Sequence, residues 1–252
     1  MKNRDELINY NNTNTMKDLI IIIPTLFNRP DLLKDAVNHV KTAILNTKYS
    51  VSLKVVINSG NEEFDKWETD VKKICSNLQF NIAKAVNSGI LDEEARYYCF
   101  FDEGIRINDI NWINILFELY NTKEFNVGSI GVRPHSTREL YCNPIEEVVS
   151  KKFNIPYKIE NLLWSDGILF FSKEIYKDVN GIDESYFGDC ELQDFCYKIH
   201  IKDKLNYRIF LPIEHKQFGF DRKISNEDEN QKLINLVMES RKKFSSKWRL
   251  QN

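Results

Sequence analysis

Three apolar runs mark the first half of the chain, at residues 19–23, 53–57 and 97–101. The first run is continuous and β-branched, a pattern typical of a strand that is buried on both faces of a parallel sheet. Pro24 ends this run. Pro30 then stands where the first turn of a helix would begin, with Asn28 as a possible cap, and apolar residues follow at helical spacing. The pattern therefore predicts strands that alternate with helices.

Similar patterns predict the remaining elements. We expect helices over residues 63–76, 87–94, 112–120 and 195–201, and an amphipathic helix from residue 226 onward. We expect further strands near residues 80–82 and over residues 127–132, 168–171 and 207–212. No internal repeat and no long biased linker divides the sequence.

This order of elements predicts an α/β fold, a mostly parallel mixed sheet with helices on both faces. Open sheets of this kind bind ligands beyond the carboxyl ends of their strands. The polar residues to inspect are those that follow the three apolar runs, at residues 25–29, 58–61 and 102–106. We expect them to lie together at one edge of the sheet.

Composition narrows the function classes. The chain has 252 residues, enough for one large domain, and 35 Lys and Arg against 37 Asp and Glu. That balance argues against unaided, tight binding of duplex nucleic acid. Residues 1–18 are polar and hold no apolar signal-peptide core, and the longest apolar run is too short to span a bilayer. We therefore expect a cytoplasmic protein whose cysteines are reduced and mostly buried.

Several short motifs occur in a fixed order. Residues 21–30 read Ile-Ile-Ile-Pro-Thr-Leu-Phe-Asn-Arg-Pro, residues 85–90 Ala-Val-Asn-Ser-Gly-Ile, and residues 100–105 Phe-Phe-Asp-Glu-Gly-Ile. Later come Asn-Gly-Ile-Asp-Glu at residues 180–184, Glu-Leu-Gln-Asp-Phe-Cys-Tyr-Lys at residues 191–198, and His215. Together these segments resemble family 2 glycosyltransferases over about residues 19–219. The resemblance implies a GT-A fold and inverting transfer of a hexose-type sugar from a nucleoside-diphosphate sugar to an acceptor hydroxyl.

The resemblance also implies which residues contact the donor nucleotide. The candidates lie in the loops that follow the strands: Thr25, Phe27, Asn28, Arg29, Asn58, Ser59, Lys84, Asn87 and Asp102. A UDP-sugar is the expected donor. Asn58 and Ser59 stand where the family usually carries the Asp that binds the base, so the identity of the base stays open.

A departing diphosphate needs its negative charge stabilised, most often by a divalent cation that carboxylates hold. By resemblance, the candidate ligands for Mn²⁺ or Mg²⁺ are Asp102, Glu103 and His215. Gly104 stands where the family motif has its third acidic residue. Either Glu103 and His215 hold the ion, or cations such as Arg106 take its place.

Inverting transfer also needs a general base that deprotonates the acceptor hydroxyl. Glu191 is the first candidate, followed by Asp189 and Asp194. Leu192 occupies the position where the family usually carries this base. Alternatively, Glu191 and Asp194 are acidic residues that stabilise the N-terminus of a helix through its dipole.

The acceptor class is not predicted, but the resemblance places Trp164 and Asp166, ahead of a strand, in the acceptor pocket. The Trp164 ring can stack on a sugar face; alternatively, it is a buried core residue. The basic residues of the terminal helix predict either a solvated face or peripheral contact with a membrane or a protein partner. These residues are Arg241, Lys242, Lys243, Lys247 and Arg249.

We therefore expect a polar extension over residues 1–18, a GT-A domain over residues 19–222 and an amphipathic helix over residues 223–252. Two alternatives stay open. One is an inactive relative that binds nucleotide sugars or a partner, because Gly104 and Leu192 both fall at catalytic positions. The other is a nucleotidyltransferase of similar fold, which would need a Gly-rich loop with Lys or Arg after the first strand; residues 24–28 do not supply one.

Overall fold

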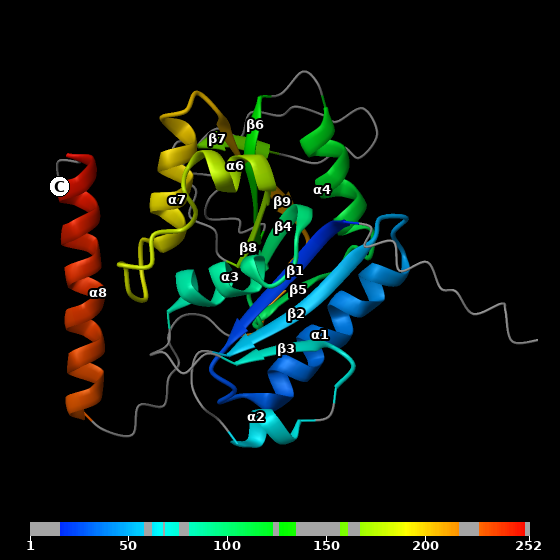
Figure 1. Cartoon of the computed structure of the whole chain (residues 1–252), viewed down its shortest axis with the longest axis horizontal. Coiled ribbons are helices and arrows are strands. Elements are labelled where there is room, and N and C mark those ends of the chain that lie inside the picture. The colour runs from blue at the N-terminus through cyan, green and yellow to red at the C-terminus, as the bar shows by residue number, and fades with distance from the viewer. Residues whose placement is uncertain are drawn as a thin grey trace, which may run out of the picture.

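The structure is a computed structural model that describes residues 16–57, 62–67, 69–75, 81–122, 126–134, 157–160, 167–216 and 227–249. In its first half, strands and helices alternate (Figure 1). The elements are β1 (Lys17–Thr25), α1 (Pro30–Leu45), β2 (Val51–Ile57), α2 (Glu62–Lys66), β3 (Lys72–Cys75), α3 (Ile82–Leu91) and β4 (Ala95–Phe101).

The second half is more mixed. Its elements are β5 (Ile105–Ile107), α4 (Trp112–Asn121), β6 (Val127–Pro134), β7 (Tyr157–Glu160), β8 (Ile168–Ser172), α6 (Lys173–Asp178), α7 (Glu191–His200), β9 (Leu205–Leu211), β10 (Ile213–His215) and α8 (Glu227–Trp248). The helices and strands predicted from residue 97 onward all occur, with ends that move by a few residues.

The main sheet has eight strands in the order β3-β2-β1-β4-β8-β6-β9-β7, and β5 and β10 form a separate antiparallel pair. Strands β3, β2, β1 and β4 are parallel to one another, and so are β6 and β9. Strand β8 runs antiparallel to both of its neighbours, and β7 runs antiparallel to β9. The predicted mostly parallel mixed sheet is confirmed.

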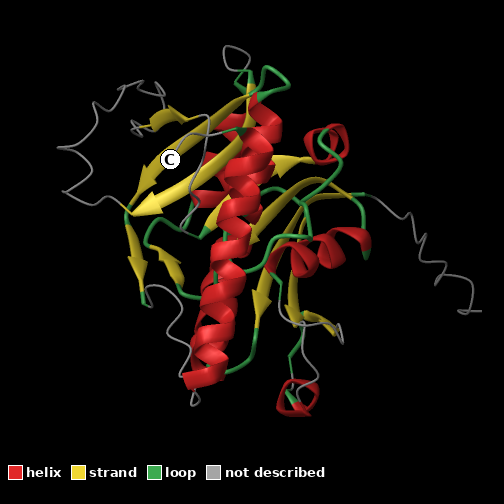
Figure 2. Ribbon diagram, turned by 90° about the vertical axis from the view of Figure 1, so that its left-hand side faces the viewer, coloured by secondary structure: helices red, strands yellow, loops and turns green. Residues whose placement is uncertain are grey.

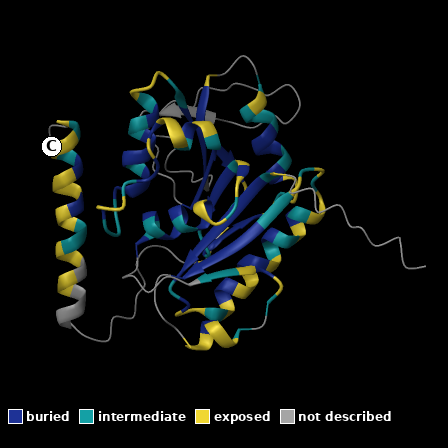
Figure 3. Cartoon of the chain, viewed as in Figure 1, coloured by how far each residue is buried: buried dark blue, intermediate teal, exposed yellow. Residues whose placement is uncertain are grey.

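Alternate residues of β1 enter two separate cores, because successive side chains of a strand point to opposite faces. Leu19, Ile21 and Ile23 pack on the face that α1 and α4 cover. Ile20 and Ile22 pack on the face that α3, α6 and α7 cover. Strand β1 is buried along most of its length (Figure 3). Helices on both faces explain why the first run is apolar at every position.

Gly89 lets α3 lie directly on β1. A Cβ at this position would meet side-chain atoms of Ile22 at 2.9 Å, closer than real contacts allow. The Gly in the Ala-Val-Asn-Ser-Gly-Ile stretch therefore has a packing role.

The region between β2 and α3 differs from the prediction. The helix expected over residues 63–76 ends at Lys66, and the strand expected near residues 80–82 lies instead at Lys72–Cys75. Lys73 explains the early end, because its Nζ donates to the carbonyl oxygens of Phe64, Asp65 and Trp67 at the end of α2. The predicted cap of α1 is also wrong: Arg29 is the cap residue, and its side chain makes no capping hydrogen bond.

Helix α8 lies on the outside of the domain and runs along it (Figure 2). Its side chains Phe244 and Trp248 pack with Tyr186 and Cys190 in a small third core. The described segments contain no helix that is both long enough and apolar enough to span a membrane.

Candidate functional site

The ends of β1 and β4 meet at one edge of the sheet. Strand β1 is paired in parallel with β2 and β4, with Thr25 beside Ile57 and Ile22 beside Phe100. Just beyond these pairs, the Thr25 hydroxyl donates a 2.6 Å hydrogen bond to the carboxylate of Glu103. The expectation that the polar residues after these strands come together is confirmed for Thr25 and Glu103.

Asp102 begins a tight turn after β4. Its carboxylate accepts from the N–H of Gly104 at 2.6 Å, and its own N–H donates to the carbonyl oxygen of Gly167 at 2.7 Å. Gly167 has a φ of +142°, and a Cβ there would meet the side chain of Ile105 at 2.4 Å. The start of β8 can therefore approach the acidic turn this closely only with glycine at this position.

Glu103 lies in a site that disfavours its charge. Burial, together with the neighbouring Asp102 carboxylate, raises the pKa of this carboxyl to about 7. The hydroxyl of Thr25 acts in the opposite direction by donating to the charged form. Two adjacent carboxylates in such a place would be stabilised by a cation.

The backbone brings His215 beside the acidic turn. In the β5–β10 pair, His215 lies opposite Ile105, and the N–H of Lys216 donates to the carbonyl oxygen of Gly104 at 2.9 Å. The side chain of His215 lies outside the described residues. Among the side chains that are described, no group of three or more His, Cys, Asp or Glu lies close enough to hold a metal ion.

The predicted donor loop after β1 divides into buried and exposed residues. Phe27 has a left-handed backbone, with a φ of 56°, and is only 4% exposed. Its ring packs against Phe64 and Trp67, which favours a role in the core over contact with a base. Asn28 is exposed, and so is Arg29, which forms a 3.4 Å ion pair with Asp31.

The remaining donor candidates lie after β2 and on α3. Lys84 is half-buried in the first turn of α3. Asn58 and Ser59 lie outside the described residues, as do the acceptor candidates Trp164 and Asp166. These four stay predictions.

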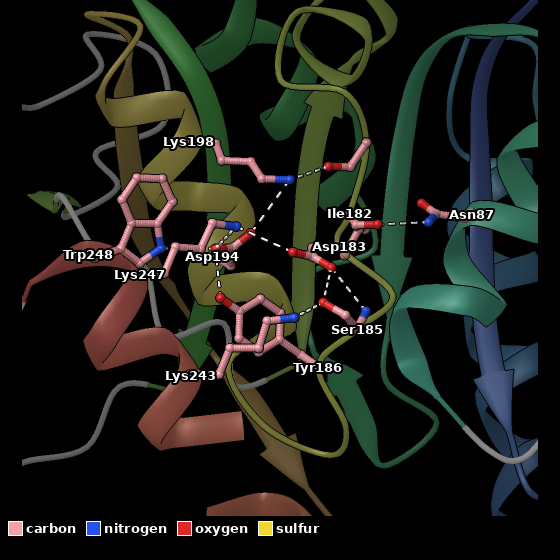
Figure 4. A network of polar contacts seen from close by, with 11 residues as sticks. Asn87, Ile182, Asp183, Ser185, Tyr186, Asp194, Lys198, Lys243, Lys247 and Trp248 are labelled. Atoms are coloured by element: carbon pink, nitrogen blue, oxygen red, sulfur yellow. Dashed lines mark hydrogen bonds and ion pairs between the residues drawn. The ribbon is translucent and has the colours of Figure 1, made fainter. Parts of the chain in front are cut away.

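The Asn87 side chain is used within the fold. Its amide donates to the carbonyl oxygen of Ile182 and the carboxylate of Glu184, both at 2.9 Å, and its oxygen accepts from the hydroxyl of Tyr176. The first of these bonds is visible in Figure 4. This set of bonds satisfies a buried amide and gives Asn87 a structural role, while its contact with the donor stays a prediction.

The Arg106 side chain likewise forms its hydrogen bonds within the protein. Its guanidinium is buried and donates to the carboxylate of Asp35 at 2.9 Å and to the carbonyl oxygens of Leu32 and Glu103, both at 2.8 Å. These bonds join α1 to the acidic turn, so Arg106 supports the site from behind instead of replacing a metal ion.

Glu191 begins α7 and is 3% exposed. Its carboxylate accepts a 2.7 Å hydrogen bond from the N–H of Gly188. Burial raises the pKa of this carboxyl, and the N–H of Gly188 opposes that rise. A buried carboxyl with a raised pKa has the character of a general base. Leu192, at the family's usual base position, packs in the core with Phe195.

Asp194 has a different role. It is fully buried, and one of its carboxylate oxygens accepts from Trp248 at 2.9 Å and from Tyr186 at 3.1 Å (Figure 4). Lys247 forms a 2.8 Å ion pair with the same oxygen, and Lys198 lies 3.5 Å from the other. Asp194 therefore anchors α8, and its predicted catalytic role stays a prediction.

Asp189 also faces α8. One of its carboxylate oxygens accepts from the N–H of Cys190 at 2.9 Å, and the other is paired with Arg241. These contacts favour a structural role for this candidate too.

The basic side chains of α8 are largely used inside the chain. Arg241 pairs with Asp189, Lys243 contacts Ser185, and Lys247 pairs with Asp183 and Asp194. All five of the predicted basic residues are nevertheless exposed, so peripheral contact of α8 with a membrane or a protein partner stays a prediction. No signal in the sequence pointed to Tyr186, Ser240 or Trp248, which make these contacts possible.

Solved structures of similar fold decide the architecture. The catalytic domain of Drosophila beta1,4-galactosyltransferase 7 in complex with xylobiose matches with a TM-score of 0.54 at 16% identity, over 82% of this chain and 74% of that one. A mannosyltransferase from Pyrobaculum calidifontis, in complex with GDP-Man and Mn²⁺, matches with a TM-score of 0.59 at 12% identity, over 82% of this chain and 59% of that one. The fold is that of the GT-A glycosyltransferases.

A mutant of the Drosophila enzyme in complex with manganese, UDP-Gal and xylobiose matches with a TM-score of 0.53 at 16% identity, over 84% of this chain and 79% of that one. Compared with known protein families, the sequence matches none, and no curated protein matches it. The GT-A fold is thus established by structure, while membership of family 2 stays a prediction.

Proposed function

We propose that this GT-A protein is an inverting glycosyltransferase that moves a hexose-type sugar from a nucleoside-diphosphate sugar to an acceptor hydroxyl. The observation that carries the proposal is the contact between Thr25 at the end of β1 and Glu103 after β4, with Asp102 beside them. It assembles acidic groups at the sheet edge where open α/β sheets bind nucleotides.

Thr25, Asn28, Arg29, Lys84 and Asp102 are the donor residues that we retain. Arg29 and Lys84 can offer positive charge to a diphosphate. The structures of similar fold hold GDP-Man in one case and UDP-Gal in another, so the donor base differs between proteins of this fold. We propose a UDP-sugar first and test GDP-sugars beside it.

A divalent cation fits the acidic turn by its chemistry. Asp102 and Glu103 supply carboxylate oxygens, the ligands that Mg²⁺ and Mn²⁺ prefer, and the backbone brings His215 alongside. When bound, such an ion would neutralise the charge that develops on the leaving diphosphate. Asp102 and Glu103 would hold it, with His215 as the third ligand.

Glu191 is the proposed general base. Its carboxylate takes the proton of the acceptor hydroxyl while that oxygen attacks the anomeric carbon of the donor. The bond from the anomeric carbon to the diphosphate oxygen breaks, and the nucleoside diphosphate leaves. Because burial raises the pKa of Glu191, transfer should increase as the pH rises and the carboxyl loses its proton.

The test is a screen of UDP- and GDP-sugars, with and without Mn²⁺, that measures release of nucleoside diphosphate. Asp102→Asn should abolish the response to Mn²⁺. Glu191→Gln keeps size and hydrogen bonding but cannot take up a proton, so turnover should fall about a hundred- to ten-thousand-fold while nucleotide affinity stays near wild type. The exposed Glu239→Gln on α8 is the matched control.

The outcomes separate the alternatives. Nucleotide-sugar binding without turnover would favour the inactive relative that Gly104 and Leu192 suggest. Turnover that Glu191→Gln leaves intact would overturn the assignment of the base. Indifference to chelators would argue for diphosphate stabilisation by Arg29 and Lys84 in place of a metal ion.

A further inference from the structure

The described polar contacts of helix α8 gather on the segment that leads into α7 and on the first turn of that helix, and Trp248 also packs on Tyr197 in the next turn. The contacts are Lys247 with Asp183, Lys243 with Ser185, Ser240 with Phe187, Arg241 with Asp189, and Lys247 and Trp248 with Asp194. Figure 4 shows the first two and the last two of these contacts. A helix this late in the sequence therefore holds the chain immediately before Glu191.

Ser240 contacts the peptide group whose N–H is bonded to Glu191. This side chain is 4% exposed, and its hydroxyl accepts from the N–H of Phe187 at 2.8 Å and donates to the carbonyl oxygen of Phe187 at 3.2 Å. The carbonyl of Phe187 and the N–H of Gly188 belong to one peptide group. That same N–H donates to the Glu191 carboxylate at 2.7 Å.

Ser240 and Glu191 thus hold opposite sides of one rigid, planar peptide. If the hydroxyl of Ser240 is removed, one side of the peptide loses its partner, and the peptide can rotate away from the carboxylate. Hydrogen bonds in such a chain also polarise one another, so the Ser240 bond strengthens the bond to Glu191.

The turn itself needs outside support. Gly188 has a φ of 71°, and Cys190, a non-glycine residue, has a φ of 70°. Left-handed backbone at a non-glycine residue costs free energy and persists only where its surroundings impose it. Ser240 and Arg241 are the residues of α8 that hold this turn.

We propose that Ser240 is a positioning residue for Glu191, acting through the peptide between Phe187 and Gly188. The inference rests on the proposed function, in which Glu191 takes the proton of the acceptor. Ser240 fixes the place of the carboxylate and favours its charged form, and it touches no substrate.

The groups around Glu191 determine whether its pKa rises or falls when Ser240 is changed. The Asp189 carboxylate raises the pKa of Glu191, while Arg241 is paired with Asp189 and the N–H of Gly188 lowers the pKa of Glu191. The thiol of Cys190 and the buried Asp194 belong to the same turn and to the first turn of α7. When the N–H of Gly188 is lost, the pKa of Glu191 must rise, and transfer then requires a higher pH.

The test compares Ser240→Ala with wild type, with Ser240→Thr, which keeps the hydroxyl, and with Lys242→Gln, an exposed residue of the same helix. In Ser240→Ala we expect kcat to fall about fivefold to tenfold, as for one lost hydrogen bond. The acid limb of the pH profile should move to higher pH, with the KM for the donor unchanged. Ser240→Thr should recover both properties, and Lys242→Gln should match wild type.

Titration of the Glu191 carboxyl by carbon NMR is the readout that does not depend on turnover. Its midpoint should move to higher pH in Ser240→Ala and not in Lys242→Gln. A lower melting temperature in Ser240→Ala with an unchanged midpoint would show a merely structural role and overturn the inference. Absence of transfer by wild type would instead overturn the proposed function, and the titration would still decide whether Ser240 controls Glu191.

Discussion

Glu103 combines a half-buried carboxyl with a neighbour of the same charge. Its pKa lies near 7 in the fold, against a usual value of 4.5. The fold therefore disfavours the ionised form, and this penalty appears as the pH rises above 4.5 and is complete above about 7. The shift corresponds to at most about 3.5 kcal/mol of unfolding free energy.

Glu103→Gln should consequently stabilise the metal-free protein at pH 8, because glutamine carries no charge and its side-chain oxygen can still accept from Thr25. At pH 4 both proteins are neutral at this position, and their unfolding free energies should agree. Urea unfolding in the presence of a chelator measures the difference. An equal gain at both pH values would show that charge is not the cause.

At the scale of single residues, the sequence predicts where a polar side chain lies better than it predicts what that side chain binds. Thr25 and Glu103 were identified because they follow apolar runs, and parallel strands bring such residues to one edge. The hydrogen bonds of Asn87 within the fold could not be predicted in this way. Its partners Tyr176, Ile182 and Glu184 are distant in sequence, so no local pattern reveals that its hydrogen bonds are already taken.

At the scale of elements, α3 holds the segment that precedes α7. The amide of Asn81 donates to the carbonyl oxygens of Glu184 and Tyr186, and Asn87 holds Ile182. The segment therefore lies between α3 on one side and α8 on the other (Figure 4). Such a clamp should contribute to stability without touching the donor.

Asn87→Ala should lower the unfolding free energy by roughly 1–3 kcal/mol, because the buried carbonyl of Ile182 and the hydroxyl of Tyr176 lose a partner. Nucleotide affinity should be nearly unchanged. Lys84→Ala, one helical turn earlier, is the matched comparison and should weaken nucleotide binding with little loss of stability. Calorimetric titration and urea unfolding of both variants measure these effects, and a reversed pattern would restore Asn87 to the donor site.

The incorrect prediction between β2 and α3 has a similar cause. Residues 63–76 have a composition that is compatible with one helix, yet α2 ends at Lys66 because Lys73 donates to three carbonyl oxygens at its end. Strand β3 then forms by pairing with β2. Tertiary contacts, which no local propensity contains, decided both boundaries.

At the scale of the whole molecule, the α/β class and the parallel half of the sheet followed from the order of apolar runs. The insertion of β8 between β4 and β6 did not, because an antiparallel strand in this place leaves no distinct mark on its own sequence. The surface on which α8 packs could not be predicted either. Its amphipathic pattern predicts a helix with a buried face but does not identify the surface that covers it.

The small core beneath α8 contains a thiol whose chemical labelling can report on the movement of this helix. Cys190 packs there with Tyr186 and Phe244, and burial raises the pKa of its thiol to about 12. A thiol in this state does not react with alkylating reagents, so labelling must wait until α8 lifts away. Phe244→Ala should speed alkylation of Cys190, while Cys99, which is buried in the central sheet, stays protected. Mass spectrometry measures the labelling of both thiols. Equal labelling rates for Cys190 and Cys99 would mean that only global unfolding exposes either thiol. The rate at which Cys190 is labelled thus measures how often α8 separates from the turn that holds Glu191.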